Sequence, residues 1–354
     1  MPERIQATET TSLPLAKDVQ LRSPPAKRLS ARVSELLISE GLVIAFVALF
    51  ILFAWQNPIF LSSANLINIL RQTAEIGIGA AGQMVVVLAA GIDLSVGSVL
   101  AISGLAAAVL ATHGTLFGNI GLDPGLAMIV AILLGAALGA INGLAVTQLR
   151  VAPIIATLAA MTFIRGLVYT WSNGIPIYSG LPDFFSQIGA GYIAGVAPIP
   201  VVLLIATYVV IGILLTKTTF GTYVYAIGGN AEAARLSGIP VNTILVLTYV
   251  ISACTASLAG IMVMGRVHSA QPLAGSGWEL DTITAVALAG VSLFGGRGSL
   301  IKVFLAALTL AVLSNGFVLL GLSPYGQMII KGLILLFAVA LDMFLSRRKR
   351  AQAA

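Results

Sequence analysis

Charged residues are scarce in this sequence. Only 9% of its 354 residues are Asp, Glu, Lys or Arg, whereas 58% are hydrophobic and the mean hydropathy is +1.02. About a quarter of the residues in a soluble domain carry charge, and a soluble fold this poor in charge would expose apolar surface and aggregate. An ordinary cytosolic enzyme, a nucleic-acid-binding protein and a disordered chain are therefore excluded, and the composition indicates a polytopic membrane protein.

Cysteine and histidine are equally rare. Cys254 is the only cysteine, which excludes a disulfide within the chain and a metal site made of several cysteines. The two histidines, His113 and His268, lie far apart and lack the spacing of a zinc-binding helix. No Lys follows a Gly, so the chain carries no phosphate-binding loop for ATP. We therefore expect neither an enzyme nor a resident cofactor or metal.

Long apolar runs dominate the remaining sequence. A membrane-spanning helix needs about twenty predominantly apolar residues, and ten segments meet this requirement approximately. They are 41–57, 73–90, 95–113, 125–147, 153–172, 198–216, 242–265, 279–295, 299–320 and 326–345. The prediction is an all-α protein with about ten transmembrane helices and both termini on one side of the membrane.

The polar segments divide the chain further. We expect residues 1–40 to form a basic segment. Leu29, Val33 and Leu36 follow helical spacing, which suggests that the segment ends in a short interfacial helix; the alternative is a plain tail. We expect residues 41–345 to form the transmembrane domain, with the longest internal polar loop at 217–241, and residues 346–354 to form a basic tail.

Lysine and arginine orient these spans. With the N-terminus in the cytoplasm, fifteen of the 19 Lys and Arg residues fall on the inner side, two (Arg71 and Arg266) on the outer side, and two (Arg165 and Lys331) within spans. Cytoplasmic loops are enriched in positive charge. Both termini are therefore expected in the cytoplasm, in a multi-pass membrane protein that contacts lipid and no nucleic acid.

Two internal similarities give conflicting alignments. Asn142-Gly143 and Asn315-Gly316 each precede a proline and lie five spans apart, as in inverted repeats. The run that begins at Leu88, Leu-Ala-Ala-Gly-Ile-Asp-Leu, resembles Leu-Ala-Gly-Val-Ser-Leu from Leu288, six spans away. Both alignments remain open.

Polar side chains inside spans are the candidates for function, because charge in a membrane is costly. Arg165 lies about twelve residues into its span, where it either lines a pathway or makes a structural ion pair. Asp93 or Ser95 could cap the helix that begins near Val96, and Asp93 could instead contact a solute. Gln83 and Asn142 could hydrogen-bond a hydroxylated solute or a neighbouring helix.

Other charged side chains have simpler interpretations. Lys331 lies nearer the outer end of the last span and is expected to extend its amine to the membrane surface. Glu75, Glu279 and Asp281 are expected near the outer ends of their spans.

Glycines are spaced for close helix packing. Gly135, Gly139 and Gly143 form a ridge with four-residue spacing, which lets another helix approach within or between subunits. Gly77, Gly79 and Gly82 are expected to act in the same way.

Four sequence motifs together resemble the permeases of ribose-type bacterial ATP-binding-cassette (ABC) sugar importers. The resemblance covers about residues 35–345. It rests on Gly-Ile-Asp-Leu-Ser-Val-Gly-Ser at 91–98, Ala-Thr-Leu-Ala-Ala-Met at 156–161 continuing to Asn173-Gly174, the loop 225–239, and Ala-Leu-Ala-Gly-Val-Ser-Leu-Phe-Gly-Gly-Arg-Gly-Ser at 287–299. Four motifs in order make a specific match.

The resemblance implies a permease subunit that imports a sugar or sugar-like solute without ATP chemistry of its own. ATP would be bound by a separate cytoplasmic ABC ATPase, and solute would arrive from a periplasmic or extracellular binding protein. A second permease subunit is expected, as a homodimer. Contact with the ATPase is assigned to the loop residues Gly228, Gly229, Asn230, Glu232, Arg235 and Gly238.

The solute pathway is assigned to six polar residues: Gln83, Asp93, Ser95, Asn142, Arg165 and Asn173. The alternative function is an ion-coupled secondary transporter of a small polar solute. Such a transporter needs a carboxylate at the solute site, and Asp93 is the one intramembrane candidate in the predicted topology. A channel is a weaker third alternative, since no filter motif is apparent.

Overall fold

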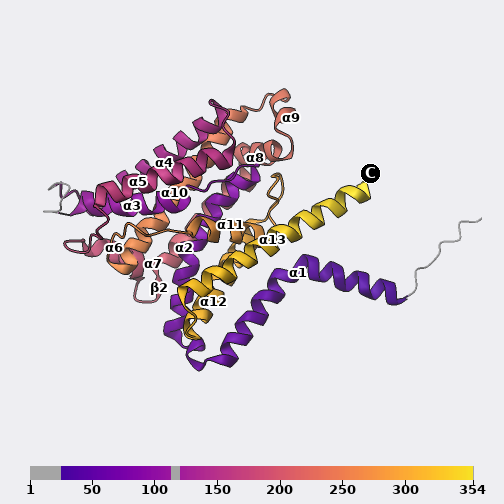
Figure 1. The fold of residues 1–354 in the computed structure, drawn as a ribbon, viewed down its shortest axis with the longest axis horizontal. Coiled ribbons are helices and arrows are strands. Elements are labelled where there is room, and N and C mark those ends of the chain that lie inside the picture. Colours follow the sequence, from indigo (N-terminus) through magenta and orange to yellow (C-terminus); the bar gives the residue numbers. More distant parts are fainter. Residues whose placement is uncertain (1–24, 113–119, 354) are drawn as a thin grey trace, which may run out of the picture. The chain divides into compact units, whose positions relative to one another are not determined.

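The computed structural model describes residues 25–112 and 120–353. The chain divides into two units, Met1–Gly41 and Leu42–Ala354, and the packing described below lies within the second unit. The helices of the described residues are α1 (Pro25–Gln56), the 3₁₀ helix η1 (Pro58–Leu61), α2 (Ser63–Leu88), α3 (Val96–Ala111), α4 (Pro124–Thr147), α5 (Pro153–Ser172), α6 (Asp183–Ala190), α7 (Ile199–Lys217), α8 (Thr219–Gly229), α9 (Ala231–Leu236), α10 (Val241–Val267), α11 (Trp278–Leu288), α12 (Leu300–Leu319) and α13 (Pro324–Ala353) (Figure 1).

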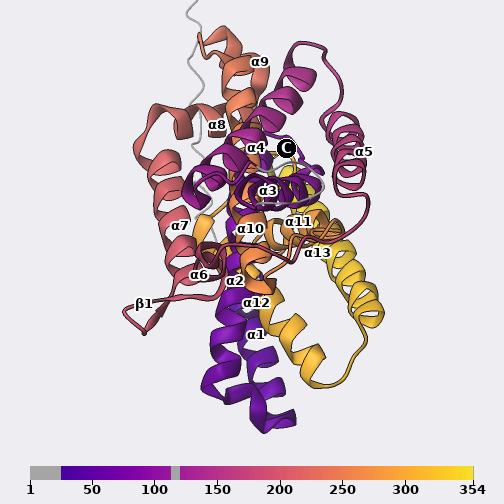
Figure 2. The ribbon, with the colours of Figure 1, turned by 90° about the vertical axis from the view of Figure 1, so that its left-hand side faces the viewer.

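One two-stranded hairpin accompanies these helices in the described residues. Strands β1 (Tyr192–Ile193) and β2 (Ala197–Pro198) pair antiparallel, with Tyr192 opposite Pro198. The all-α fold class is therefore confirmed. Figure 2 shows α8 and α9 at one end of the helix bundle and the turn between α12 and α13 towards the opposite end.

Each of the ten expected spans contains a helix, but several boundaries differ from the prediction. Within the described residues, five helices are long and apolar enough to cross a membrane by length and composition: α4, α5, α7, α10 and α12. Three shorter apolar stretches are Gly41–Gln56, Val96–Ala111 and Pro324–Ala340. The predicted span 279–295 is wrong at its end, because α11 stops at Leu288. Residues 1–24 of the predicted basic tail lie outside the described residues.

Helix α2 is long but comparatively polar, and packing explains this combination. Of its 26 residues, the eighteen buried ones include Thr73, Glu75 and Gln83. The helix packs against α7, α10, α11 and α12. Because α2 is surrounded by protein, its polar side chains meet other side chains rather than lipid.

The outer helices show the opposite pattern. Helix α7 buries only Pro200, Leu204, Ile211 and Leu215, while large apolar side chains such as Ile205 and Val209 are more than half exposed. Similar exposed apolar residues lie on α4, α5 and α13. An apolar surface of this extent marks contact with a membrane or with another protein.

The glycine ridge of α4 packs against α10, within the subunit. An added Cβ at Gly139 would lie 2.5 Å from the carbonyl oxygen of Tyr249, and one at Gly143 would lie 2.6 Å from the Cα of Val246. At Gly135 the added atom would overlap the hydroxyl of Ser257. Glycine is therefore needed along this ridge because the backbones approach too closely for a side chain.

Helices α2 and α11 end in the same way. The Ala90 and Gly91 N–H groups bond back to the carbonyls of Val87 and Val86, and the N–H groups of residues 290 and 291 bond back to those of residues 287 and 286. The second residue after each helix, Ala90 after α2 and Gly290 after α11, has a left-handed backbone conformation, with φ of 62° and 70°. The two helix ends therefore correspond residue by residue in the alignment that places Leu88 opposite Leu288.

The ridge generates the first prediction. Gly139→Ala should destabilise the folded protein by about 1–3 kcal/mol, because the new methyl group must displace the backbone of α10. Gly166→Ala is the matched control, since no atom lies within 4 Å of an added Cβ there. The thermal midpoint of the purified protein in detergent measures both variants. Equal midpoints for the two variants would contradict the close packing of α4 on α10.

Candidate functional site

The break between α2 and α3 holds a buried carboxylate. Asp93 is fully buried. Its Oδ1 accepts hydrogen bonds from the Ser95 N–H at 3.0 Å and the Ser95 hydroxyl at 2.6 Å, and its Oδ2 accepts one from the Ser252 hydroxyl at 2.9 Å. Because these donors surround both oxygens, the carboxylate is held without a counter-ion at ion-pair distance in the described residues.

Two further polar residues join this cluster. The Asn142 Nδ2 donates to the Ser95 Oγ at 2.8 Å. The Gln83 amide, oriented by its neighbours, accepts from the Asp93 N–H at 3.2 Å and donates to the Asp93 carbonyl at 3.1 Å. We call these five residues, Gln83, Asp93, Ser95, Asn142 and Ser252, the Asp93 network. It connects α2, the break, α4 and α10.

Four members of the Asp93 network are predicted by the sequence, whereas Ser252 is not. A serine inside a long apolar helix has no distinctive sequence signal, and α10 also contains Thr255 and Ser257. Helix α3 begins at Val96, as expected, but the Ser95 side chain makes no capping hydrogen bond. The Asp93 side chain instead accepts the Ser95 N–H.

Arg165 reaches the other side of the same break. Its Nη1 donates to the carbonyls of Pro272 and Ala274, both at 2.8 Å, and its Nη2 donates to the Gly97 carbonyl at 3.2 Å. These carbonyls belong to the loop before α11 and to the first turn of α3. Arg165 therefore joins the loop before α11 to the first turn of α3.

Two other side-chain bonds attach α5 to the break. The Thr157 hydroxyl donates to the Ile92 carbonyl at 3.2 Å, and the Ser98 hydroxyl donates to the Met161 carbonyl at 2.8 Å. Asn173 lies elsewhere: it is the exposed C-cap of α5, with φ of 51°. Asn173 makes no hydrogen bond to the other five residues assigned to the pathway, and its own assignment stays a prediction.

The loop expected to contact the ATPase, residues 217–241, forms two short helices that we call the coupling segment. Asn230 caps α9, because its Oδ1 accepts the N–H groups of Glu232 and Ala233, each at 3.0 Å. Gly238 ends α9 with φ of 83°. Glu232 and Arg235 are exposed, and Leu236 exposes 82% of its surface.

The coupling segment also touches the helix break. The Cα of Gly228 packs against the Leu88 carbonyl and the Gly296 N–H, leaving no room for a side chain. The Gly296 N–H itself donates to the Leu88 carbonyl at 2.9 Å. A cavity of about 170 Å³ lies beside this contact, lined by Gly228, Gly229, Ser292, Phe294, Gly295, Gly296 and Arg297. The coupling segment thus meets the end of α2 and the connection between α11 and α12.

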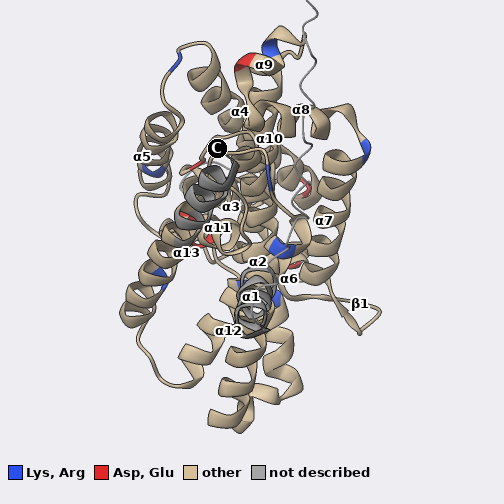
Figure 3. Ribbon diagram, turned by 90° about the vertical axis from the view of Figure 1, so that its right-hand side faces the viewer, with Lys and Arg blue, Asp and Glu red and all other residues tan. Residues whose placement is uncertain are grey.

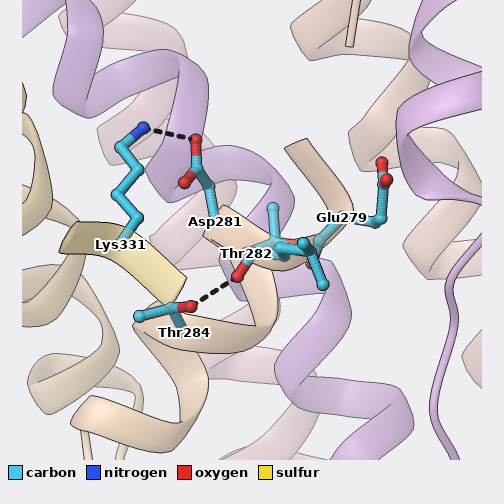
Figure 4. Close-up of polar contacts among 6 residues, drawn as sticks. Glu279, Asp281, Thr282, Thr284 and Lys331 are labelled. Atoms are coloured by element: carbon cyan, nitrogen blue, oxygen red, sulfur yellow. Dashed lines mark hydrogen bonds and ion pairs between the residues drawn. The ribbon is translucent and has the colours of Figure 1, made fainter. Parts of the chain in front are cut away.

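Ion pairs hold two other parts of the bundle. Lys331 of α13 contacts the Asp281 carboxylate of α11 at 2.9 Å (Figure 4), so its amine has a protein partner rather than the expected position at the membrane surface. Arg266 donates to Glu75 at 3.1 Å. Among the described residues, no group of three metal-ligating side chains could hold a metal ion.

The Asp93 network generates the second prediction. Ser252→Ala should lower the free energy of unfolding by about 1–3 kcal/mol, because a buried carboxylate oxygen loses its donor. Thr162→Val is the control, since Thr162 is exposed on α5 and bonds only within its own helix. Thermal unfolding of both variants provides the measurement. A Ser252→Ala protein as stable as the control would show that the carboxylate does not depend on this donor.

Comparisons with known proteins agree on one family. The sequence profile of a family described as the branched-chain amino acid transport system permease component matches residues 65–339. The ribose import permease protein RbsC of Haemophilus influenzae is 41% identical over 321 residues, covering 90% of this chain and 97% of that protein. The Bacillus subtilis RbsC is 44% identical over 301 residues, covering 84% and 91%.

A third relative carries a different sugar in its name. The L-arabinose transport system permease protein AraH of Escherichia coli is 36% identical over 318 residues, covering 88% of this chain and 92% of that protein. No solved structure matches. The profile and the relatives each span most of the described bundle, including both capped helix ends and the coupling segment, and the chain therefore belongs to this family of transport-system permeases.

Proposed function

We propose that this chain is the permease subunit of an ABC importer that moves a sugar or sugar-like solute across the bacterial inner membrane. The observation that carries the proposal is the similarity to ribose and arabinose permeases over most of the chain. The absence of a phosphate-binding loop in the sequence accords with ATP hydrolysis in a separate subunit. The further partners in this proposal are an external solute-binding protein and a second copy of the chain.

The distribution of charge supports a cytoplasmic position for the coupling segment. Figure 3 shows Lys and Arg at α9, at the turn between α4 and α5, and near the end of α7, all towards the same end of the bundle. These segments contain Arg235, Arg150 and Lys217. Positive charge favours the cytoplasmic side, and the proposed topology has ten spans with both termini inside.

The contact at Gly228 suggests how ATP binding reaches the solute pathway. An ATPase bound to the exposed face of α9 would move α8, and Gly228 packs against the ends of α2 and the α11–α12 connection. Such movement would shift the break that carries the Asp93 network. Because Asp93 is fully buried, we assign the network to the inner gate, which opens when the break moves.

The proposed function is tested by reconstituting the chain in proteoliposomes with a cognate ABC ATPase and binding protein. Uptake of labelled D-ribose or L-arabinose should require ATP on the side of the membrane where the ATPase is bound. Uptake should stop when the ATPase cannot hydrolyse ATP, and it should persist when an ionophore is added. Uptake that stops with the ionophore and ignores ATP would establish the ion-coupled transporter instead.

A third prediction concerns docking. Arg235→Glu should weaken binding of the ATPase roughly tenfold, because reversing a charge at an interface opposes the complementary surface. Arg150→Glu is the control, an equal change of charge in the exposed turn between α4 and α5, outside the coupling segment. Co-purification of ATPase with each variant measures binding. Unchanged binding in Arg235→Glu would remove α9 from the docking surface.

A fourth prediction concerns topology. In a Cys254→Ser background, a cysteine replacing the exposed Glu232 should react only with a thiol reagent supplied from the cytoplasm. A cysteine replacing Val196, which is 82% exposed in the turn between β1 and β2, should react only from outside. Reaction of both positions from the same side would refute the proposed topology.

A further inference from the structure

Glu279 lies at the middle of the bundle, which corrects the sequence-based expectation that it lies near the outer end of a span. Helix α11 begins at Trp278, and the ring of Trp278 fills the space beside Gly79 of α2. Gly79 is sixteen residues into α2, about 24 Å along a helix about 39 Å long. The loop before α11 therefore turns back into the bundle and delivers a carboxylate to its interior.

The surroundings of Glu279 provide space, hydrogen-bond donors and a positive charge for its carboxylate. Gly97 has no side chain at the point where the Glu279 Oε2 packs against it. The backbone N–H groups of Gly277 and Glu279 face the carboxylate, and the Arg165 guanidinium is near enough to interact with it electrostatically. The Gly97 carbonyl in turn accepts a hydrogen bond from Arg165 at 3.2 Å. Three chain segments thus meet at this carboxylate: α5, the start of α3 and the start of α11.

Glu279 differs from the other acidic residues inside the bundle. Asp93 is fully buried and surrounded by donors, while Glu75 and Asp281 have ion-pair partners. Glu279 is partly exposed, and neither ion pair found in the described residues includes it. In Figure 4 its carboxylate points away from the Asp281–Lys331 pair. An exposed carboxylate at this depth is tolerated where it faces water or a polar ligand rather than lipid.

We propose that Glu279 and Arg165 form a sugar-contacting site within the permease itself. The carboxylate accepts hydrogen bonds from two neighbouring hydroxyl groups of a sugar, and the remaining N–H groups of Arg165 donate to a ring or hydroxyl oxygen. Arg165 already donates to three carbonyls, so it stays in position without Glu279. This proposal rests on the proposed function, because it names the residues that contact the transported sugar.

Analogues of the transported sugar test this site in the complete assembly. D-ribose or L-arabinose, whichever the wild-type assembly imports, is compared with those of its monodeoxy analogues that are also imported. Glu279→Gln should lower uptake of the parent sugar roughly tenfold. It should leave uptake of the analogue that lacks the recognised hydroxyl nearly unchanged. The same binding protein delivers both compounds to both variants, so its preference cancels in the ratio.

Asp281→Asn is the matched control, since it alters a carboxylate two residues away that pairs with Lys331. It should change the amount of folded protein and leave the ratio of parent to analogue uptake at the wild-type value. An equal loss for parent and all analogues in Glu279→Gln, or no loss, would overturn the site. A wild-type assembly whose sugar uptake stops with an ionophore and ignores ATP would instead refute the proposed function.

Thiol labelling gives a readout that does not depend on transport. In the Cys254→Ser background, Glu279→Cys should react with a water-soluble methanethiosulfonate reagent, and D-ribose or L-arabinose with the binding protein present should slow the reaction. A cysteine at buried Thr282, three residues along α11, is the control and should not react. A Cys at position 279 that fails to react, or that reacts equally fast with sugar, would contradict the proposal.

Discussion

Helices that end inside a membrane must find protein partners for their free backbone groups, because lipid offers none. The rest of this structure depends on that constraint. Helix α2 ends at Leu88, and its carbonyl accepts the Gly296 N–H. Helix α3 begins after Ser95, whose N–H is accepted by Asp93. The loop before α11 leaves the carbonyls of Pro272 and Ala274, which Arg165 satisfies. The polar residues of the interior are therefore first of all partners of broken helices.

The same requirement explains why the proposed coupling segment lies close to the proposed pathway residues. The ends of α2 and α11 share a cap, and Gly228 of the coupling segment packs against the end of α2 and against Gly296 in the connection that follows α11. In the proposed mechanism, a movement of α8 would act on the Leu88 carbonyl, which lies five residues before Asp93 in the sequence. Because packed interiors shift between discrete arrangements rather than bending gradually, a small displacement at Gly228 can release the break as a whole.

The sequence predicted the elements better than their depth. Apolar runs located a helix in each expected span, and the ridge at Gly135, Gly139 and Gly143 was correctly interpreted as a packing surface. Glu279 was misplaced, because hydropathy treats 279–295 as one span and carries no information on a loop that turns back into the bundle. Ser252 was missed because its role arises only when α10 lies beside the break. Partners across helices depend on packing, which a linear pattern does not record.

The most direct test of this account is hydrogen exchange in the assembled transporter, compared with and without nucleotide. Our account predicts that nucleotide binding to the ATPase alters exchange in peptides that cover residues 88–95 and 292–297, because the Gly296 N–H bonds to the Leu88 carbonyl beside Gly228. Changes confined to α8 and α9, with unaltered exchange in both of those peptides, would contradict it.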